Sequence, residues 1–467
     1  MLFPTVRFAI FFAIVLPTSW LLMHRRTRWR VFILVASYAF YGSWDWHFVF
    51  LLGGSTLANQ GLAMLIDRAP TEGSRTRRLA IAVAANLALL GWFKYYDFFV
   101  NSTSNALTTF GIHWDAPLRR IVLPVGISFI TFQALSYVID TYRRDVRPVP
   151  LLDFAVYLSF FPHLVAGPIV RASEFLPQLR RPADARRVDA GLALWLIAAG
   201  LFKKVVISSY LASTIVDPVF GFPNQHKGFD TLLGIYGYAI QIYADFSGYT
   251  DMAIGLALLM GFRFPQNFDQ PYRSKTLQEF WRRWHMTLSR WLRDYLYVPL
   301  GGNRRGKARG YVNLAATMVL GGLWHGAAWT FVAWGALHGL GLAVERWRAD
   351  HRAPDKEAWP PWAHTLITFH VVCLGWVFFR AESFSGAWHV LTRLLHPGIG
   401  TPFNPVLVAV IAGCLALQFV PADWSSRLRS IFSRLHPAAQ ALGLSLFVVA
   451  TNALGPIGVA PFIYFQF

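Results

Sequence analysis

Two histidines lie in a stretch apolar enough to enter a lipid bilayer, GGLWHGAAWTFVAWGALHG at residues 321–339. An imidazole at membrane depth is costly and usually faces an interior cavity or a pathway. On one continuous helix, the side chains of His325 and His338 would point about 140° away from each other. This geometry argues against a metal ion shared by the two histidines. The residues alone leave a functional and a structural role for His325 equally open.

Glycines surround both histidines at a spacing that matters for helix packing. Gly322 and Gly326 flank His325 in a GxxxG pattern, and Gly335 and Gly339 repeat this spacing around His338. Small residues four apart let another helix approach closely. We therefore expect the glycines to serve tight helix packing.

A third histidine, His285, lies in the stretch SKTLQEFWRRWHMTLSRWLRDYLYVPLGG at 274–302. On one helix of 3.6 residues per turn, large apolar side chains form a stripe, and arginines occupy the other side. The stripe consists of Leu277, Phe280, Trp281, Trp284, Leu288, Trp291, Leu292 and Tyr295. Such a helix is too polar to span and should lie at the membrane interface, with His285 at the edge of the stripe. Taken alone, this pattern favours an ordinary interfacial histidine.

The loop that follows, PLGGNRRGKARG at 299–310, is rich in glycine and basic residues. Its backbone N–H groups and charges could hold the phosphates of a nucleotide-bearing donor. It lacks the residue order of a P-loop, and a basic cytoplasmic loop explains the same composition. The residues favour this second interpretation.

Two aspartates interrupt another apolar stretch, YADFSGYTDMAIG at 243–255. An intramembrane carboxylate is expected to pair with another group or to take part in function. Asp245 could orient a histidine or bind a cation, and Asp251 could pair with an arginine. A structural ion pair is an equally good explanation of each. Pro and Gly in LPVGISF (123–129) and in FFPHLVAGPIVR (160–171) also predict broken helices, which are tolerated where they line a cavity.

The elements that position these residues must be membrane helices. Of the 467 residues, 55% are hydrophobic and only 14% are charged, and apolar segments recur along the whole chain. Lys and Arg cluster between these segments, so the net charge of +19 indicates loops near anionic lipid rather than a nucleic-acid partner. Two cysteines, Cys373 and Cys414, argue against a thiolate metal site.

The sequence therefore predicts an all-α polytopic membrane protein, a single domain over 1–467 with a motif core at about 120–345. We expect about eleven to thirteen transmembrane or re-entrant helices, since a span requires about 20 residues. The N-terminal stretch lacks a cleavage site and reads as a retained first span. Further candidate spans lie near 31–52, 78–93, 121–139, 152–166, 188–202, 229–244, 249–261, 312–344, 364–379, 404–420 and 438–453.

Five of these stretches, in this order, resemble the membrane-bound O-acyltransferase (MBOAT) family. They are LPVGISFITFQALSYVIDTYRR, FPHLVAGPIVR, YADFSGYTDMAIG, FWRRWHMTLSRWLRDYLYVPLGGNR and GLWHGAAWTFVAWGALHG. The bacterial branch of alginate O-acetyltransferases is the most similar, and the D-alanyl transferase of teichoic acid modification is more distant. The resemblance runs from about residue 30 to residue 345, and beyond residue 380 it is one of general hydropathy.

This resemblance implies a ring of membrane helices around a tunnel and transfer of an acyl group from a thioester to a hydroxyl. The invariant histidine of the family corresponds to His325 in LWHG, and a second family histidine corresponds to His285 in RRWH. A neutral imidazole suits the general base that takes the hydroxyl proton. We expect His325 to be this base and His285 to position the donor or the acceptor. We expect supporting roles for Asp245, His338, Asn303 and Arg304, where His338 would either serve packing or support a residue that contacts the substrate.

The resemblance also implies acetyl-CoA as the donor substrate, with no bound cofactor and no metal, although a carrier-protein thioester could replace CoA. The acceptor would be an exported polysaccharide or an extracytoplasmic acetyltransferase that passes the group on. We expect a multi-pass protein of the inner membrane, with 262–311 facing the cytoplasm. A transporter or flippase would use the same buried carboxylates and broken helices. A non-catalytic scaffold of polysaccharide secretion is a third possibility.

Overall fold

A computed structural model describes residues 1, 3–114, 117, 119, 121–181, 183–351, 359–400 and 404–455. All regular secondary structure in these residues is helical, which confirms the predicted all-α class. The chain divides into two compact units. Unit 1 comprises Met1–Asp189 and Leu256–Phe264, and unit 2 comprises Ala190–Gly255 and Pro265–Phe467.

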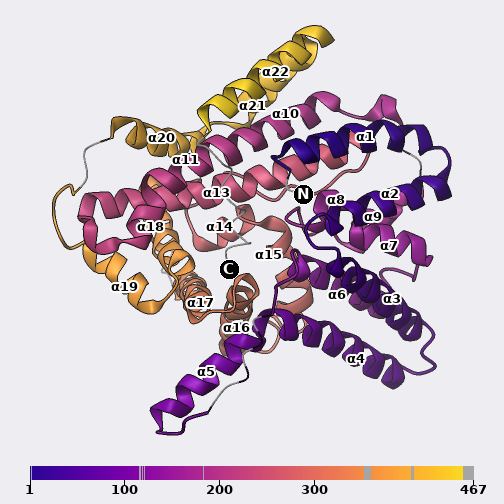
Figure 1. Ribbon diagram of the computed structural model, residues 1–467. Coiled ribbons are helices and arrows are strands. Elements are labelled where there is room, and N and C mark those ends of the chain that lie inside the picture. Colours follow the sequence, from indigo (N-terminus) through magenta and orange to yellow (C-terminus); the bar gives the residue numbers. More distant parts are fainter. Residues whose placement is uncertain are drawn as a thin grey trace. The chain divides into compact units, whose positions relative to one another are not determined.

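Unit 1 contains the N-terminal helices, drawn in indigo and purple in Figure 1. They are α1 (Val6–Leu22), α2 (Arg26–Gly42), α3 (His47–Asp67), α4 (Glu72–Leu90), α5 (Tyr96–Thr109), α6 (Ile127–Arg143), α7 (Leu151–Ser159), α8 (Phe161–Leu164) and α9 (Ala172–Leu179). Helix α6 begins directly after Gly126, whose φ of 74° is a left-handed conformation. Glycine adopts this conformation without steric cost. The start of α6 at this residue confirms the predicted break at LPVG.

Unit 2 holds all the candidate catalytic residues. Its helices are α10 (Ala190–Phe202), α11 (Ser209–Leu211), α12 (Asp217–Gly221), α13 (Gly228–Leu259, its last turn in unit 1), α14 (Leu277–Arg283), α15 (Met286–Leu292), α16 (Lys307–His325), α17 (Trp329–His351), α18 (Pro361–Arg380), α19 (Phe384–Arg393), α20 (Pro405–Ala416), α21 (Ala422–Arg434) and α22 (Pro437–Leu454). A π-helical segment, η3 (Lys203–Ser208), continues α10. The two predicted spans at 229–244 and 249–261 are one continuous helix, α13.

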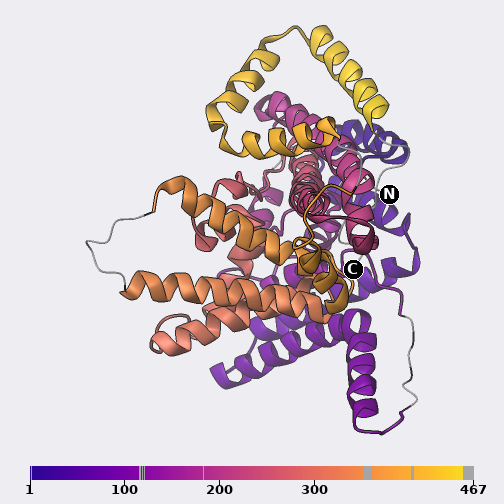
Figure 2. The ribbon, with the colours of Figure 1, turned by 90° about the vertical axis from the view of Figure 1, so that its left-hand side faces the viewer.

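The predicted span at 312–344 is wrong, because this segment is a hairpin of α16 and α17. The chain turns at residues 326–328, where Gly326 has an extended backbone that ends α16. Figures 1 and 2 show the two helices side by side. A Cβ placed on Gly335 of α17 would lie 2.9 Å from Val319 Cα of α16. The glycines therefore serve close helix packing, as predicted.

Four helical segments among the described residues are long and apolar enough to cross a membrane. They are His47–Asp67, Glu72–Thr109, Ala190–Gly221 and Pro361–Arg380. Apolar helices of 10–17 residues, such as α1, are too short for this criterion. The expected count of eleven to thirteen is therefore not confirmed. The assignment as a membrane protein rests on these apolar segments together with the relatives described below.

Candidate active site

His285 lies at a sharp break between α14 and α15. The sequence pattern predicted one continuous helix here, and this prediction is wrong. Its backbone is left-handed, with φ 42° and ψ 54°. Its side chain is fully buried, which corrects the expected place at the edge of an interfacial stripe. A non-glycine residue in this conformation costs of order 1–3 kcal/mol, and such residues cluster at functional sites.

Asn267 fixes both the His285 ring and the start of α15. Its Oδ1 lies 3.1 Å from His285 Nδ1 and accepts hydrogen bonds from the Thr287 N–H at 3.1 Å and the Thr287 hydroxyl at 2.8 Å. Its backbone carbonyl accepts a bond from the Met286 N–H at 2.9 Å. Because an amide oxygen only accepts, His285 Nδ1 carries the proton and Nε2 presents a lone pair. This Nε2 is buried and has no hydrogen-bond partner among the described residues.

His325 is the last residue of α16, and 3% of its surface is exposed. Its ring lies in a box of aromatic side chains. Ring centroids of Trp324, Trp334 and Phe379 lie 5.0, 5.1 and 5.2 Å from that of His325. These rings exclude bulk water around the imidazole, and a dry site strengthens every electrostatic interaction inside it.

The structure brings His325 and His285 together. Their ring centroids are 6.5 Å apart, and the Phe246 ring packs perpendicular to that of His285 with centroids 4.6 Å apart. Two imidazoles at this separation are near enough to contact one bound substrate. The geometry therefore suits a general base and a second imidazole that positions the substrate.

His338 is on α17, so it does not share a helix with His325 as the sequence analysis assumed. The ring is fully buried. Its centroid lies 5.0 Å from Trp334, 5.3 Å from Trp281 and 6.2 Å from Phe280. The expected packing role agrees with these contacts, yet neither ring nitrogen has a hydrogen-bond partner within the part of the chain that the structure describes.

Asp245 forms a buried ion pair with Lys204 of η3, and the Ser208 hydroxyl donates to the same carboxylate at 3.2 Å. Asp251 pairs with Lys203 at 2.5 Å, where the sequence analysis expected an arginine. Both aspartates belong to α13. Each aspartate is therefore part of a structural ion pair. These contacts do not support the orienting role proposed for Asp245.

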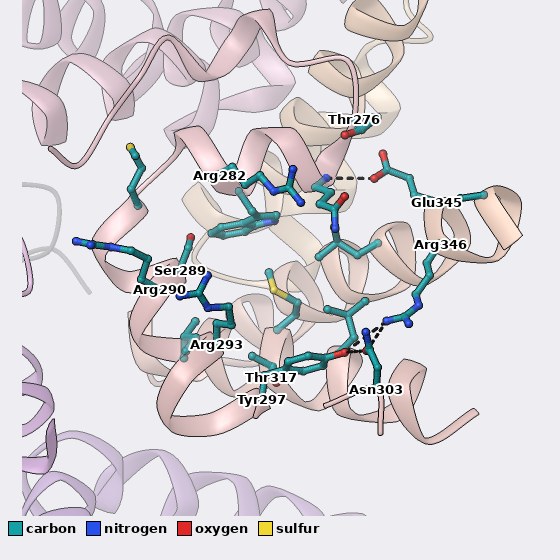
Figure 3. A pocket seen from close by; sticks show the side chains of 18 residues that line it. Thr276, Arg282, Ser289, Arg290, Arg293, Tyr297, Asn303, Thr317, Glu345 and Arg346 are labelled. Atoms are coloured by element: carbon teal, nitrogen blue, oxygen red, sulfur yellow. Dashed lines mark hydrogen bonds between the residues drawn. The ribbon is translucent and has the colours of Figure 1, made fainter. Parts of the chain in front are cut away.

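A cavity of about 800 Å³ opens in unit 2 beside α14, α15 and the α16–α17 hairpin. Four arginines line it: Arg282, Arg290, Arg293 and Arg346. Figure 3 shows the first three on one side and Arg346 with Glu345 and Asn303 on the other. Neither His285 nor His325 is among the lining residues, although Met286 and Trp281 are.

Hydrogen bonds fix one wall of this cavity. Asn303 Oδ1 accepts bonds from Arg346 Nη1 at 2.6 Å and from the Tyr297 hydroxyl. Glu345 accepts bonds from the backbone N–H groups of Leu277 at 2.6 Å and Gln278 at 3.1 Å. Burial raises the pKa of the Glu345 carboxyl, and these two hydrogen bonds partly offset the rise. Arg304 is exposed and is not among the lining residues.

Sequence reasoning missed three groups of this site. Asn267 lies in a polar segment with no catalytic motif, so its contact with His285 had no signal in the sequence. Lys203 and Lys204 did have a signal in the sequence, because they follow an apolar run. Two adjacent lysines at membrane depth are costly and should pair with the aspartates.

Arg282, Arg290 and Arg293 were assigned to the outer face of a single helix, and the break at His285 changes this assignment. The fourth arginine of the cavity, Arg346 of α17, had no predicted role.

The described residues form helices, some of them long and apolar enough to cross a membrane, and they place two buried histidines together. Comparison with known proteins defines the class of this protein. The model of the membrane-bound O-acyltransferase family matches residues 19–384. The chain is 38% identical over 466 residues to the probable alginate O-acetylase of Pseudomonas putida, which covers 94% of each chain. It is 44% identical over 372 residues to that of Pseudomonas aeruginosa, covering 79% of this chain and 70% of the relative.

Another relative, named for a different acceptor, is the peptidoglycan O-acetyltransferase of Helicobacter pylori. It is 37% identical over 395 residues, covering 78% of this chain and 73% of the relative. The chain belongs to the membrane-bound O-acyltransferase family. It is therefore an enzyme that transfers an acyl group to oxygen, and the transporter, flippase and scaffold interpretations lose their support.

Proposed function

We propose that this enzyme transfers an acetyl group from acetyl-CoA to a hydroxyl group of an exported polysaccharide, or of an extracytoplasmic acetyltransferase that passes the group on. The observation that carries the mechanism is the buried pair of His325 and His285 with ring centroids 6.5 Å apart. The relatives support the acetyl group, since those cited are O-acetylases or O-acetyltransferases by name.

In this mechanism His325 is the general base. It takes the proton from the acceptor hydroxyl as the oxygen attacks the thioester carbonyl, and the thiolate then leaves. The lone pair of His285 Nε2 accepts a hydrogen bond from a neighbouring hydroxyl group of the acceptor and holds the acceptor in position. The Asn267 contact keeps the His285 ring in the required tautomer. Orientation of this kind supplies part of the rate enhancement, because a misplacement of about 1 Å can cost 10²-fold.

The arginine-lined cavity is the proposed place of the donor. Guanidinium groups bind phosphate oxygens through paired hydrogen bonds, and CoA carries three phosphate groups. Asn303 acts by holding Arg346 in place. Arg304 keeps only a long-range electrostatic role, because it does not line the cavity. A carrier-protein thioester is the competing donor, and its acidic surface would meet the same arginines.

Membranes that contain the enzyme or its His325→Ala variant test this proposal directly. With radiolabelled acetyl-CoA, we expect label in polysaccharide or protein only with the wild type. Loss of a general base should lower the rate about 10²–10⁴-fold. Label at the wild-type rate with the variant would contradict the role of His325. If neither protein transfers label from acetyl-CoA but the wild type transfers it from an acetylated carrier protein, the donor is the carrier protein and not acetyl-CoA.

We place the enzyme in the inner membrane, with the 262–311 segment facing the cytoplasm, where soluble thioesters are found. Lys307 at the start of α16 has an exposed side chain that pairs with Asp350 at 3.4 Å. In a background without Cys373 and Cys414, a Lys307→Cys variant should react with an impermeant thiol reagent only after the cells are opened. Labelling from outside intact cells would show that the 262–311 segment faces away from the cytoplasm.

A further inference from the structure

His338 is a buried polar side chain that the mechanism above does not use. Its ring packs against Trp334, Trp281 and Phe280, and Gly375 of α18 lies so close that a Cβ there would meet His338 Nε2 at 2.8 Å. Packing alone would be served by leucine or phenylalanine. A buried polar group without a hydrogen bond costs about 1–3 kcal/mol, so the histidine requires an explanation.

The surroundings of His338 join the histidine pair to the cavity. Trp334 contacts both His338 and His325, with centroid distances of 5.0 and 5.1 Å. Trp281 is 5.3 Å from His338 and 5.6 Å from Trp334, so the three rings form one cluster, and Trp281 lines the arginine-rich cavity. A continuous series of ring contacts therefore runs from His325 to the cavity wall.

Polar atoms accompany these contacts. The Nε1 atoms of Trp281 and Trp334 are buried and, like both His338 nitrogens, have no hydrogen-bond partner in the residues that the structure describes. Buried water is held by two to four polar partners, and three adjoining side chains supply four here. The indole N–H groups only donate, so His338 is the member of this cluster that can both accept and release a proton.

We propose that His338 relays the proton between the His325–His285 pair and the cavity, an inference that rests on the proposed function. In the reaction, the acceptor O–H bond and the thioester C–S bond break, and a new C–O ester bond forms. The hydroxyl proton passes from His325 through water to one ring nitrogen of His338. The other nitrogen releases a proton toward the cavity, where the departing thiolate becomes a thiol.

A relay uses both ring nitrogens, whereas an anchoring histidine has one of them bonded. His285 and His163 show this difference, since His285 Nδ1 contacts Asn267 at 3.1 Å and His163 Nε2 contacts the Tyr157 carbonyl at 2.8 Å. His338 differs from both, because both its nitrogens are buried without a partner among the described residues. His338 therefore lacks the anchoring hydrogen bond that His285 and His163 have.

Acetyl transfer by wild type, His325→Ala and His338→Leu enzyme, measured in the same membranes, tests the relay. We expect His338→Leu to lower kcat by about tenfold or more with little change in KM for the donor. Its thermal unfolding temperature should equal or exceed that of the wild type, because an unbonded polar ring is replaced by an apolar side chain. As a matched control, His163→Leu should lower the unfolding temperature, because it leaves the Tyr157 carbonyl without that partner.

Chemical rescue adds a readout that packing cannot produce. Imidazole should restore activity to His338→Ala, whereas pyrazole, which has the same shape and is a far weaker base, should not. Full activity of His338→Leu, equal rescue by the two compounds or rescue by neither would overturn the relay. If the wild type is inactive with every donor tested, the proposed function is wrong, and the relay that rests on it is wrong as well.

Discussion

The amide oxygen of Asn267 lies 3.1 Å from His285 Nδ1 and also accepts two hydrogen bonds from Thr287. One side chain thus fixes the tautomer of a candidate active-site histidine and the start of the helix that follows it. The orientation of His285 and the local fold of α15 depend on the same atom.

Replacement of Asn267 should therefore reduce both stability and activity. Asn267→Ala leaves two Thr287 donors and the His285 ring without their acceptor, so we expect a loss of about 1–3 kcal/mol in unfolding free energy. Acetyl transfer should fall by about 10²-fold as the ring loses its position. Thermal unfolding in detergent and the membrane assay measure the two effects. The exposed Asn224 provides a control, and equal behaviour of Asn224→Ala and Asn267→Ala would refute the anchoring role.

The left-handed backbone of His285 gives a prediction that concerns the main chain alone. Glycine adopts φ 42° freely and alanine does not, so His285→Gly should be more stable than His285→Ala by about 1 kcal/mol. Both variants lose the imidazole and should lose acetyl transfer. In an ordinary helix the order is reversed, because glycine is the weaker helix former. Unfolding temperatures of the pair therefore report whether the break at His285 exists.

Glu345 connects α17 to the first turn of α14, and this contact can be removed. Glu345→Ala leaves the N–H groups of Leu277 and Gln278 without their carboxylate acceptor, which should cost about 0.5–2 kcal/mol, as for the loss of a helix cap. Glu345→Gln keeps one acceptor oxygen and should lose less. Thermal unfolding of both variants checks this order. A Glu345→Ala protein as stable as the wild type would show that α14 does not depend on the contact.

Glycine substitutions distinguish the contact between α16 and α17 from exposed helix surface. Gly335→Ala places a Cβ against Val319, and overpacking of this kind costs about 1–3 kcal/mol. Gly61 of α3 has open space around it, so Gly61→Ala should be neutral or stabilising by up to about 1 kcal/mol. The two variants carry the same chemical change, and their unfolding temperatures should move in opposite directions. A similar shift in both would indicate a general effect of alanine.

The buried pair of Lys204 and Asp245 should respond to substitution more strongly than the pair of Lys203 and Asp251. Side chains of the first pair are 2% and 3% exposed, and those of the second are 21% and 24% exposed. Lys204→Met leaves a buried carboxylate without its cation, which should cost about 3–5 kcal/mol. Lys203→Met should cost less because its partner keeps contact with solvent. Purification yield and unfolding temperature of the two variants check the prediction, and equal losses would contradict it.

Much of the fold class could be predicted from the sequence, since long apolar segments and glycine spacing act through local rules. The breaks at Gly126 and the packing of Gly335 followed from residue type alone. The number of membrane helices could not be predicted, because several helices are short or carry buried polar groups. Hydropathy cannot separate such helices from those of soluble proteins. The hairpin turn after His325 was also missed, since GAA at 326–328 is compatible with a helix by composition.

The candidate site was predicted in part. His325 and His285 were assigned roles from family motifs, and the structure places their rings together. The position of His285 was wrong, because the periodicity of 274–302 fits one helix, while tertiary contacts from Asn267 stabilise a break within it. Long-range contacts of this kind have no local signature. The Lys204–Asp245 pair shows the same limit, since the sequence indicates that Asp245 needs a partner but does not say which one.

The hairpin that ends α16 at His325 also bears on the order of folding. Its two helices are adjacent in the chain, so loop-closure entropy is small and the contact forms quickly. Domains and subdomains fold as they leave the ribosome, N-terminal parts first. The glycine contacts between α16 and α17 can therefore form before α18 packs against them. The histidine at the turn would then already be in place when the later helices of unit 2 pack around it.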